Sequence, residues 1–409
     1  MKALIAGAGI GGLTTALQLH EAGIEVEIFE RVGEVRELGV GINMLSHAVA
    51  VLADLGLQAG LDAAGIRVRE LIYTNRFGQV VWQELRGLDA GQEAPQVSIH
   101  RGKLLGVIHR AVIARLGPDV IRMGCRVEGF EQTEDGVAVH FSGTDGWRGT
   151  ARGDLLIGAD GIHSAIRAQL YPDEGPPIWS GIMLWRGATR WPIWRDGRTM
   201  VISGGNFAKF VYYPIGADPA EPEMRLTNWA VMAKVGEPGT SPLRREDWSR
   251  SGLSDEVLPF VRDRFHLDFV DPASIIQATE NFYEYPNCDR DPLPRWSFER
   301  VTLLGDAAHA MYPVGSNGAS QAILDARCLA RHLQSGDGIE AALSRYDAER
   351  RPVTSQIVLS NRLGGPEGVI DMIEARAPDG FDDIDTVASF EERKATVRGY
   401  ASLARGRSQ

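Results

Sequence analysis

The sequence predicts an α/β protein with two domains, in which a β-sheet domain is inserted into a βαβ-type core and helices follow at the C-terminal end. Three observations predict this arrangement. Residues 2–30 contain a strand, a glycine-rich turn, a helix and a second strand, about the length of one βαβ unit. Seven of the nine tryptophans lie between residues 179 and 296, among stretches with β-type alternation. Apolar runs typical of buried strands stand on either side of that region, at 154–161 and 299–305.

Composition limits the class of protein. The chain has 409 residues, 44% of them hydrophobic and 24% charged, which excludes wholesale disorder. The net charge of -11 speaks against nucleic acid as a partner, because such binding rests on clustered Lys and Arg. No apolar run approaches the roughly 18 residues of a membrane helix, so we expect no membrane association. The three cysteines are far apart and form no CxxC pair, so we predict no metal site and a cytoplasmic location.

The remaining elements are predicted in chain order from periodicity. Residues 42–65 and 102–116 show apolar positions three and four apart, as in helices. Residues 66–85 alternate like a hairpin with a turn near Asn75–Gly78, and 119–142 like two strands around Glu134–Gly136. The later elements are strands at 199–204, 209–216 and 225–233, and helices at 320–334, 339–361 and 389–404.

The N-terminal turn carries a dinucleotide-binding fingerprint. Gly7, Gly9 and Gly12 form GxGxxG between a strand and a helix, and the second strand ends at Glu30. In such a Rossmann-like unit the glycines permit a tight turn and close approach of a pyrophosphate, while the acidic residue accepts hydrogen bonds from a ribose. The fingerprint alone does not separate FAD from NAD.

Two further stretches carry a family resemblance. GADGIHSAIR occupies residues 158–167, and LLGDAAHAMYPVGSNGASQAILDA occupies 303–326. With the N-terminal fingerprint, they resemble the single-component aromatic-ring flavoprotein monooxygenases, which include para-hydroxybenzoate and salicylate hydroxylases. The resemblance covers most of residues 1–365. Further stretches are similar to the phenazine-hydroxylating members of that family: LGVGIN (38–43), SIHRGKL (98–104), WRG (185–187), DRDPLP (289–294) and MYPVGSNGASQAILDA (311–326).

The resemblance implies the fold and the domain division. The fold is then para-hydroxybenzoate hydroxylase-like: a Rossmann-like FAD-binding domain with an inserted β-sheet substrate domain and C-terminal helices. The FAD-binding domain comprises 1–70, 97–175 and 290–365. The substrate domain comprises 71–96 and 176–289, and a C-terminal helical extension comprises 366–409.

The resemblance also implies residues that bind FAD. Asp306 follows a buried strand, where it can accept a hydrogen bond from a ribityl hydroxyl. The first residues of the next helix, Gly318, Ala319 and Ser320, present free N–H groups to the flavin pyrimidine edge. One departure is the loop Ser316–Asn317–Gly318, where many members carry GQG, and it argues against a salicylate-type substrate. The other expected cofactor-binding residues are Ile10, Gly11, Arg31, Val40, Gly41, Arg101, Val127 and Asp160.

Two motif residues have alternative interpretations. Asp160 and Arg167 either pair near the path of the nicotinamide or serve the turn and the following helix structurally. For His309 we favour a structural role, and a general base is the less favoured alternative. We assign no catalytic residue, because the flavin carries out the chemistry.

The substrate residues are predicted from their position next to the resemblance motifs. Trp185, Tyr213 and Tyr312 are candidate aromatic walls, with core packing as the alternative for each. Arg186 is a candidate partner for a substrate carboxylate, with a structural ion pair as the alternative. Pro313 completes the set.

The predicted activity is hydroxylation of an aromatic or heteroaromatic substrate by an FAD-dependent monooxygenase that uses NAD(P)H and O₂. In the family this proceeds through a flavin C4a-hydroperoxide, and a phenazine-type or other polycyclic acid is the expected substrate. The alternatives are an FAD-dependent oxidase or dehydrogenase on the same scaffold, and a non-catalytic redox sensor. We expect non-covalent FAD, because no HxxC-type attachment sequence stands near a flavin face, and a monomer or homodimer.

Overall fold

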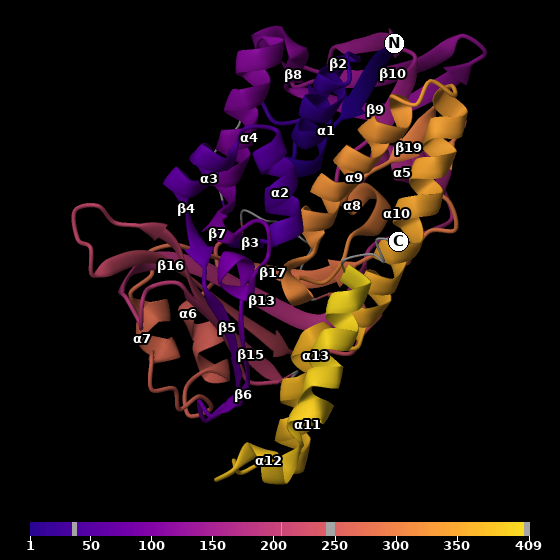
Figure 1. The fold of residues 1–409 in the computed structure, drawn as a ribbon. Coiled ribbons are helices and arrows are strands. Elements are labelled where there is room, and N and C mark those ends of the chain that lie inside the picture. Colours follow the sequence, from indigo (N-terminus) through magenta and orange to yellow (C-terminus); the bar gives the residue numbers. More distant parts are fainter. Residues whose placement is uncertain (35–38, 206, 243–249, 405–409) are drawn as a thin grey trace.

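The structure is a computed structural model that describes residues 1–34, 39–205, 207–242 and 250–404. The first residue of the LGVGIN stretch, Leu38, and the last five residues of the predicted C-terminal extension lie outside the described residues. Within them, the chain forms an upper half built around one sheet and a lower half built around another (Figure 1).

The upper half contains a six-stranded sheet whose central strands are parallel, as the βαβ pattern predicts. The first strand lies in the middle, so residues 3–6 are fully buried between neighbouring strands and helices. In spatial order the strands are β18 (Ser297–Phe298), β19 (Val301–Leu303), β12 (Leu155–Gly158), β1 (Lys2–Ala6), β2 (Glu25–Glu30) and β8 (Ile121–Met123).

Three helices that begin at or follow the cofactor motifs pack together beside this sheet. Helix α1 (Ile10–Glu21) packs beside α9 (Gly318–Leu333), and α10 (Ile339–Arg362) lies against α9. The other helical segments of this half are α2 (Ser46–Asp54), α3 (Gln58–Ala64), α4 (Arg101–Leu116), η2 (Pro118–Val120), α5 (Ala165–Leu170), α8 (Asp306–His309) and η4 (Val314–Ser316).

Two three-stranded sheets complete the upper half. One consists of β11 (Arg148–Gly153), β10 (Gly136–Gly143) and β9 (Cys125–Thr133), and contains the predicted hairpin. The other consists of β3 (Gly41–Met44), β7 (Gln96–His100) and β4 (Gly65–Val68), and lies at the junction with the lower half.

The prediction of a helix over 42–65 is wrong at both ends. Residues 41–44 form β3, which is paired with β7, and residue 65 begins β4. The helical part is divided in two at Gly56, which has a φ of +72°. Local apolar spacing identified the helical turns, but strand pairing with residues 96–100 decided the ends, and that pairing is not visible in the local pattern.

The lower half contains a seven-stranded sheet. Its strands come from residues 70–85 and 178–289, and the residues between these two segments belong largely to the upper half. In spatial order they are β17 (Phe282–Asp289), β13 (Ile178–Pro192), β16 (Met224–Lys234), β15 (Ala208–Ala217), β14 (Thr199–Ser203), β5 (Glu70–Thr74) and β6 (Val80–Leu85).

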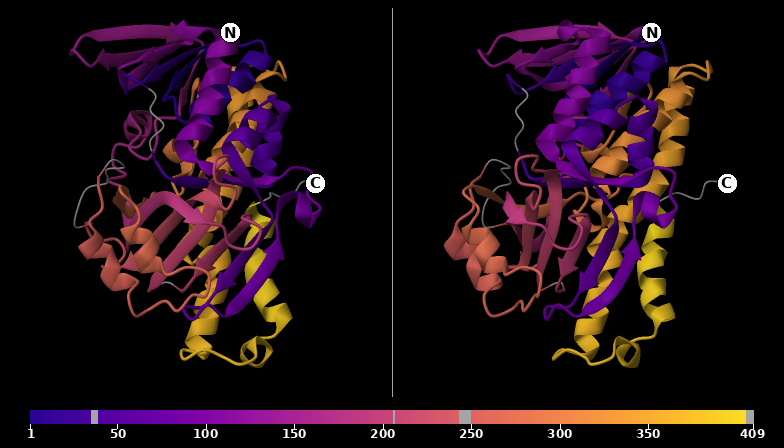
Figure 2. Two further views of the ribbon diagram at one scale, coloured as in Figure 1. Left: turned by 90° about the vertical axis from the view of Figure 1, so that its left-hand side faces the viewer. Right: turned by 60° about the vertical axis from the view of Figure 1, so that its left-hand side comes forward.

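The two faces of the seven-stranded sheet are covered by different segments (Figure 2). One face packs against the short helices of residues 254–277, including Val257, Ile275 and Ile276. The other packs against the C-terminal extension through Val369, Ile370 and Ile373, all fully buried. The helical segments of this half are η1 (Gly87–Ala90), α6 (Ser254–Val257), η3 (Leu258–Phe260), α7 (Pro272–Gln277), η5 (Gly365–Glu367), α11 (Gly368–Arg376), α12 (Ile384–Val387) and α13 (Phe390–Ala404).

The C-terminal extension is therefore an integral part of the fold. Its helix α13 stacks Phe390 on Trp82 of β6, with ring centroids 5.2 Å apart. Arg393 of the same helix donates to the carbonyl of Val81 and is paired with Asp385. None of the described helices is both long enough and apolar enough to cross a membrane.

Candidate active site

The glycine turn at the N-terminus is as tight as the fingerprint requires. Gly7 has a φ of +100°, and a Cβ there would lie 2.4 Å from the carbonyl oxygen of Ala159. A Cβ on Gly12 would lie 2.0 Å from the carbonyl oxygen of Gly7. Both glycines are thus required by contacts within the protein itself.

Gly9 and Gly318 differ from these two glycines. A Cβ on either would meet no protein atom within 4 Å. Gly9 is the N-cap of α1 and Gly318 is the first residue of α9, and among the described residues no side chain caps either helix N-terminus. Free N–H groups beside open space are the features of an anion site. These two helix ends therefore fit the phosphates and the flavin ring of FAD.

Asp306 and Arg101 lie near one another in the upper half. The Asp306 side chain is exposed, yet burial raises the pKa of its carboxyl, and the nearby His309 and Arg101 lower it in part. The same environment lowers the pKa of Arg101, chiefly through burial. Protein thus surrounds both groups on most sides but leaves them accessible. A carboxylate in such a position gains from hydroxyl donors of a ligand, which fits the ribityl chain of FAD.

Glu30 supports the glycine turn directly. Its carboxylate accepts from the N–H of Ala8 at 2.7 Å and from that of Val32 at 3.0 Å. Each carboxylate oxygen keeps a second acceptor position, so a ribose diol can still bind. Arg31 beside it is exposed.

The other predicted cofactor residues fall into two groups. Ile10 and Gly11 belong to the first turn of α1, where Gly11 lies against Leu304 and Ala322. Val40 and Val127 are buried, at 7% exposed each, and the carbonyl of Val40 accepts from the N–H of Arg101. For Val127 the core of the upper half accounts for the burial, so its role in an adenine pocket remains a prediction.

Gly41 connects the two halves of the molecule. Its N–H donates to Oδ1 of Asn228 at 2.7 Å, and its carbonyl accepts from the guanidinium of Arg186. A Cβ at this position would lie 2.7 Å from that of Asn228, so only glycine allows the approach.

Of the two interpretations of Asp160 and Arg167, the hydrogen bonds favour the structural one over a pairing. Asp160 accepts from the hydroxyl of Ser164 at 2.5 Å and from the N–H of Ala165 at 2.7 Å, so it serves the turn before α5. Arg167, 1% exposed, is paired instead with Glu174. It also donates to the carbonyls of residues 307 and 308 at 3.0 Å each. Both residues thus take the structural alternative, and Arg167 fixes the short helix that carries Asp306.

His309 has the structural role rather than that of a general base. Its Nε2 lies 2.6 Å from Asp325, which is fully buried and also paired with Arg350 at 2.7 Å. These charges lower the pKa of the Asp325 carboxyl against the opposing effect of burial. The imidazole is 2% exposed and therefore cannot reach a substrate.

A cavity of about 330 Å³ lies between the two halves. Its floor is one face of the seven-stranded sheet, and side chains at alternate positions of each strand point into it. The floor residues are Leu71, Tyr73, Leu184, Arg186, Met200, Ile202, Val211, Tyr213, Ala230 and Met232. The opposite wall comes from β3, the start of α2, the loop before α9, and the C-terminal extension. It includes Asn43, Leu45, Ser46, His47, Pro313, Gly315, Ser316, Asn317, Pro366, Glu367 and Val397.

Three of the five predicted substrate residues line this cavity: Arg186, Tyr213 and Pro313. Arg186 donates to the hydroxyl of Tyr285 at 2.9 Å and to the carbonyl of Gly41. Burial disfavours the charged form of the Arg186 guanidinium. The phenol groups of Tyr285 and Tyr213 outweigh this effect, so the pKa of Arg186 is raised. Burial raises the pKa of Tyr213 in turn. The donors of Arg186 thus already have partners in the protein.

Trp185 and Tyr312 lie elsewhere, so we withdraw them as candidate walls. Trp185 follows Leu184 and precedes Arg186 on β13, so it points to the opposite face of the sheet, where it stacks on Phe260. The Tyr312 hydroxyl is directed to Asp289, and the carbonyl of Tyr312 accepts from Asn361 at 2.9 Å. For both residues, adjacency to a motif in sequence did not predict the direction of the side chain.

The sequence analysis missed several residues of the cavity. Asn228 holds Gly41, and His47 and Arg86 line the wall. The Nε of Arg86 is buried and has no hydrogen-bond partner within the part of the chain that the structure describes. In the described ranges its guanidinium is ion-paired with Glu84 alone. The alternation of β-strands could have found Leu184, which stands two residues before Arg186, but no local signal singled out Asn228 or Arg86.

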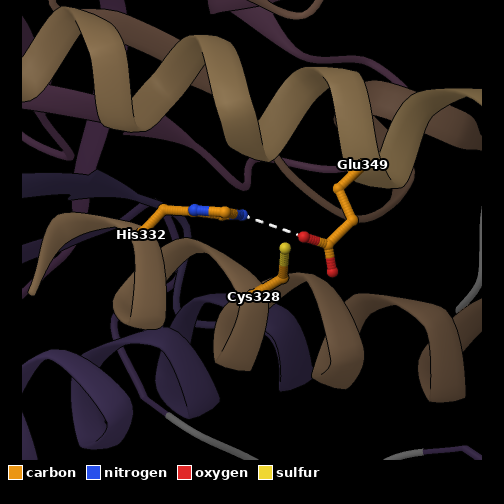
Figure 3. Close-up of side chains that lie close together, drawn as sticks. All are labelled: Cys328, His332 and Glu349. Atoms are coloured by element: carbon orange, nitrogen blue, oxygen red, sulfur yellow. Dashed lines mark hydrogen bonds and ion pairs between the residues drawn. The ribbon is translucent and has the colours of Figure 1, made fainter. Parts of the chain in front are cut away.

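A second cluster of polar side chains lies on α9 and α10, away from the cavity. Cys328, His332 and Glu349 have their ligand-type atoms within 4.8 Å of one another (Figure 3). The guanidinium of Arg331 contacts all three: it pairs with Glu349 and lies 3.6 Å from the Cys328 sulfur and 3.3 Å from His332. Burial raises the pKa of the thiol to about 12. A cation and a protonated thiol oppose metal binding, so we interpret the cluster as a link between the two helices.

The comparisons with known proteins agree with the geometry. The family model described as FAD binding domain matches residues 1–179 and 274–360. A phenazine 1,6-dicarboxylic acid hydroxylase from Lysobacter antibioticus is 46% identical over 363 residues, 88% of each chain. An aurachin C monooxygenase/isomerase from Stigmatella aurantiaca is 35% identical over 371 residues, 89% of each chain. The structure of HpxO from Klebsiella pneumoniae with FAD and uric acid has a TM-score of 0.75 at 24% identity. That alignment covers 99% of this chain and 97% of the other.

The contrast between the two kinds of glycine generates a prediction. Gly12→Ala should destabilise the apoprotein by about 1–3 kcal/mol or more, because its Cβ would overlap the carbonyl of Gly7. Gly9→Ala should leave apoprotein stability within about 0.5 kcal/mol, but weaken FAD binding because its Cβ occupies the open space. Denaturant unfolding of the apoproteins and titration with FAD separate the two effects. Equal FAD affinity in Gly9→Ala and the parent would contradict the assignment.

The position of Asp306 generates a second prediction. Asp306→Ala should lower FAD affinity about ten- to a hundredfold, since a hydrogen bond to a charged group contributes about 1.5–3 kcal/mol. Glu340→Ala, which removes an exposed carboxylate from α10, is the matched control and should bind FAD like the parent. Quenching of FAD fluorescence measures both, with circular dichroism to establish folding. A folded Asp306→Ala protein with unchanged affinity would show that this carboxylate does not contact the cofactor.

Proposed function

The chain belongs to the FAD binding domain family, and from this premise we propose that it hydroxylates a flat polycyclic aromatic acid of the phenazine type with NAD(P)H and O₂. The family and the hydroxylase relatives identify an FAD-dependent enzyme. The choice of substrate rests on the cavity, which has a broad apolar floor. The similarity of the chain to a phenazine acid hydroxylase supports the same choice.

The bound flavin supplies electron transfer from the nicotinamide and the activation of oxygen. The protein residues bind and orient. When FAD is bound, the turn at residues 7–12 and Glu30 would hold the adenosine and phosphates, and Asp306 would hold the ribityl chain. The N–H groups at the start of α9 would stabilise negative charge that develops on the flavin ring, as a helix N-terminus does for an anion.

The cavity holds the aromatic ring and keeps water away. Leu71, Met200, Ile202 and Met232 give the floor an apolar surface on which a flat ligand buries its faces. The volume of about 330 Å³ falls within the range of small-molecule sites, roughly 300–1,000 Å³. The loop Val314–Ser316 forms part of the opposite wall, directly before α9, so the ring lies next to the flavin position.

Arg86, rather than Arg186, is the residue we assign to the substrate acid group. Arg186 is engaged by Gly41 and Tyr285, whereas among the described residues the guanidinium of Arg86 is ion-paired with Glu84 alone. Arg186 stands on β13, and Arg86 directly follows β6. These two strands are five positions apart in the sheet. Five spacings of about 4.8 Å correspond to roughly 24 Å between strand axes. The two cations therefore lie at opposite ends of the cavity.

The remaining assignments belong to the same proposal. We place the enzyme in the cytoplasm, which fits three free thiols, and we propose a monomer or homodimer. We name no acid or base for the reaction.

The substrate class is tested by comparing kcat/KM for phenazine-1-carboxylate, salicylate and para-hydroxybenzoate. We expect the phenazine acid to be preferred at least about tenfold, because each additional stacked ring adds buried apolar area. Product with one added oxygen must be measured together with NAD(P)H loss, since uncoupled turnover consumes NAD(P)H without hydroxylation. Coupled hydroxylation of the monocyclic acids alone would reject the polycyclic substrate and leave the hydroxylase assignment intact.

The role of Arg86 is tested with a matched pair of variants. Arg86→Met should raise KM for phenazine-1-carboxylate about ten- to a hundredfold, the loss expected for a charge-assisted hydrogen bond, but change KM for neutral phenazine little. Arg186→Met should affect acid and neutral ligands alike, because it loosens β3 from the sheet. A larger acid-specific effect in Arg186→Met than in Arg86→Met would reverse the assignment.

A further inference from the structure

A buried ion pair lies beside the cavity and has no part in the mechanism above. Lys209 of β15 and Glu367 of η5 form it, and their side chains are 5% and 4% exposed. Lysine and glutamate are almost never buried to this extent unless they are paired. Glu367 lines the cavity with its neighbour Pro366.

The same carboxylate also holds the loop before α9. The N–H of Gly315 donates to Oε1 of Glu367 at 3.3 Å, while Oε2 receives Lys209. Glu367 thus joins three parts of the molecule that are distant in sequence: the seven-stranded sheet, the C-terminal extension and the loop Val314–Ser316. The family model ends at residue 360, so the extension that supplies Glu367 lies beyond it.

The loop has a backbone that requires such support. Gly315 has a φ of +65°, and Ser316 has a φ of +59°, in the left-handed region that residues with a side chain seldom adopt. Strained positions of this kind persist only where surrounding contacts hold them, and they are concentrated at functional sites. Residues 315–317 line the cavity, and α9 begins directly after them.

We propose that the Lys209–Glu367 pair is a positioning device that holds residues 314–317, and through them the N-terminus of α9, in register with the flavin ring and the substrate. Neither residue touches the reacting atoms. The pair gives the C-terminal extension a role in the reaction besides covering the sheet. This inference rests on the proposed function, because it takes the flavin ring to lie at the start of α9.

The decisive variant replaces the pair with apolar side chains of similar size, Lys209→Met together with Glu367→Leu. Substitution of a buried ion pair in this way is often neutral for stability, whereas removal of one partner leaves an uncompensated buried charge. The double variant should therefore fold, with a melting temperature close to that of the parent. Lys209→Met with Glu367→Gln, which leaves no buried charge and keeps a neutral acceptor for Gly315, is the second variant and is tested by the same measurements if the first double variant does not fold.

The readouts are those that a purely structural pair would not change. We expect FAD affinity to fall about tenfold, the visible flavin absorption bands to shift, and turnover with NADPH and phenazine-1-carboxylate to fall by up to about a hundredfold, as misplacement by an ångström can cause. Arg393→Met with Asp385→Leu removes another ion pair of the extension, one that does not line the cavity. This control should retain parental FAD affinity and flavin absorption.

Parental FAD affinity, flavin spectrum and turnover in a folded double variant would overturn the inference. An equal loss of all three in the control would overturn it as well, because any loosening of the extension would then suffice. Failure of the proposed function is distinguishable from both outcomes. In that case the parent protein itself would bind no FAD, or would form no hydroxylated product from any aromatic acid.

Discussion

The backbone of Gly41 is the point on which the arrangement of the two halves depends. Its N–H and its carbonyl are both bonded to side chains of the seven-stranded sheet, Asn228 and Arg186. A backbone segment can approach a sheet this closely only without a side chain, since a Cβ would overlap Asn228 and Ile215. The cavity lies directly behind this contact, so its shape follows from how closely β3 approaches the sheet.

Buried charges behind the cofactor site also hold the backbone around it in place. Arg167 is bonded to the carbonyls of the short helix that begins with Asp306, and Asp325 is bonded to His309 and Arg350. Each of these charges has a partner of opposite sign, which limits the cost of burial. Loss of Glu174 would deprive Arg167 of an acidic partner, and loss of Asp325 would do the same to Arg350, so the network resists rearrangement. Asp306 is thereby held in place by residues that do not themselves contact a ligand.

Local patterns in the sequence were sufficient for much of the fold and for the cofactor half of the site. The first thirty residues show a strand, a glycine turn, a helix and a second strand that ends at Glu30. The contacts of Gly7 and Gly12 agree with this order. The hairpins at 70–85 and 125–143 and the helices at 101–116 and 339–362 also follow from periodicity. The helix predicted over 42–65 failed where β3 and β4 pair with the distant β7.

The sequence by itself thus determined the cofactor motifs and the class of fold, because glycine sterics and strand and helix periodicity act over a few residues. The tertiary structure alone decided which side chains form the cavity. Arg186 and Trp185 are neighbours in sequence, yet they point to opposite faces of one sheet. Which face is enclosed depends on β3, the loop before α9 and the C-terminal extension, which reach it from opposite ends of the chain. Contacts of this range, such as Lys209 with Glu367, form only when the whole chain has folded, so no local pattern predicts them.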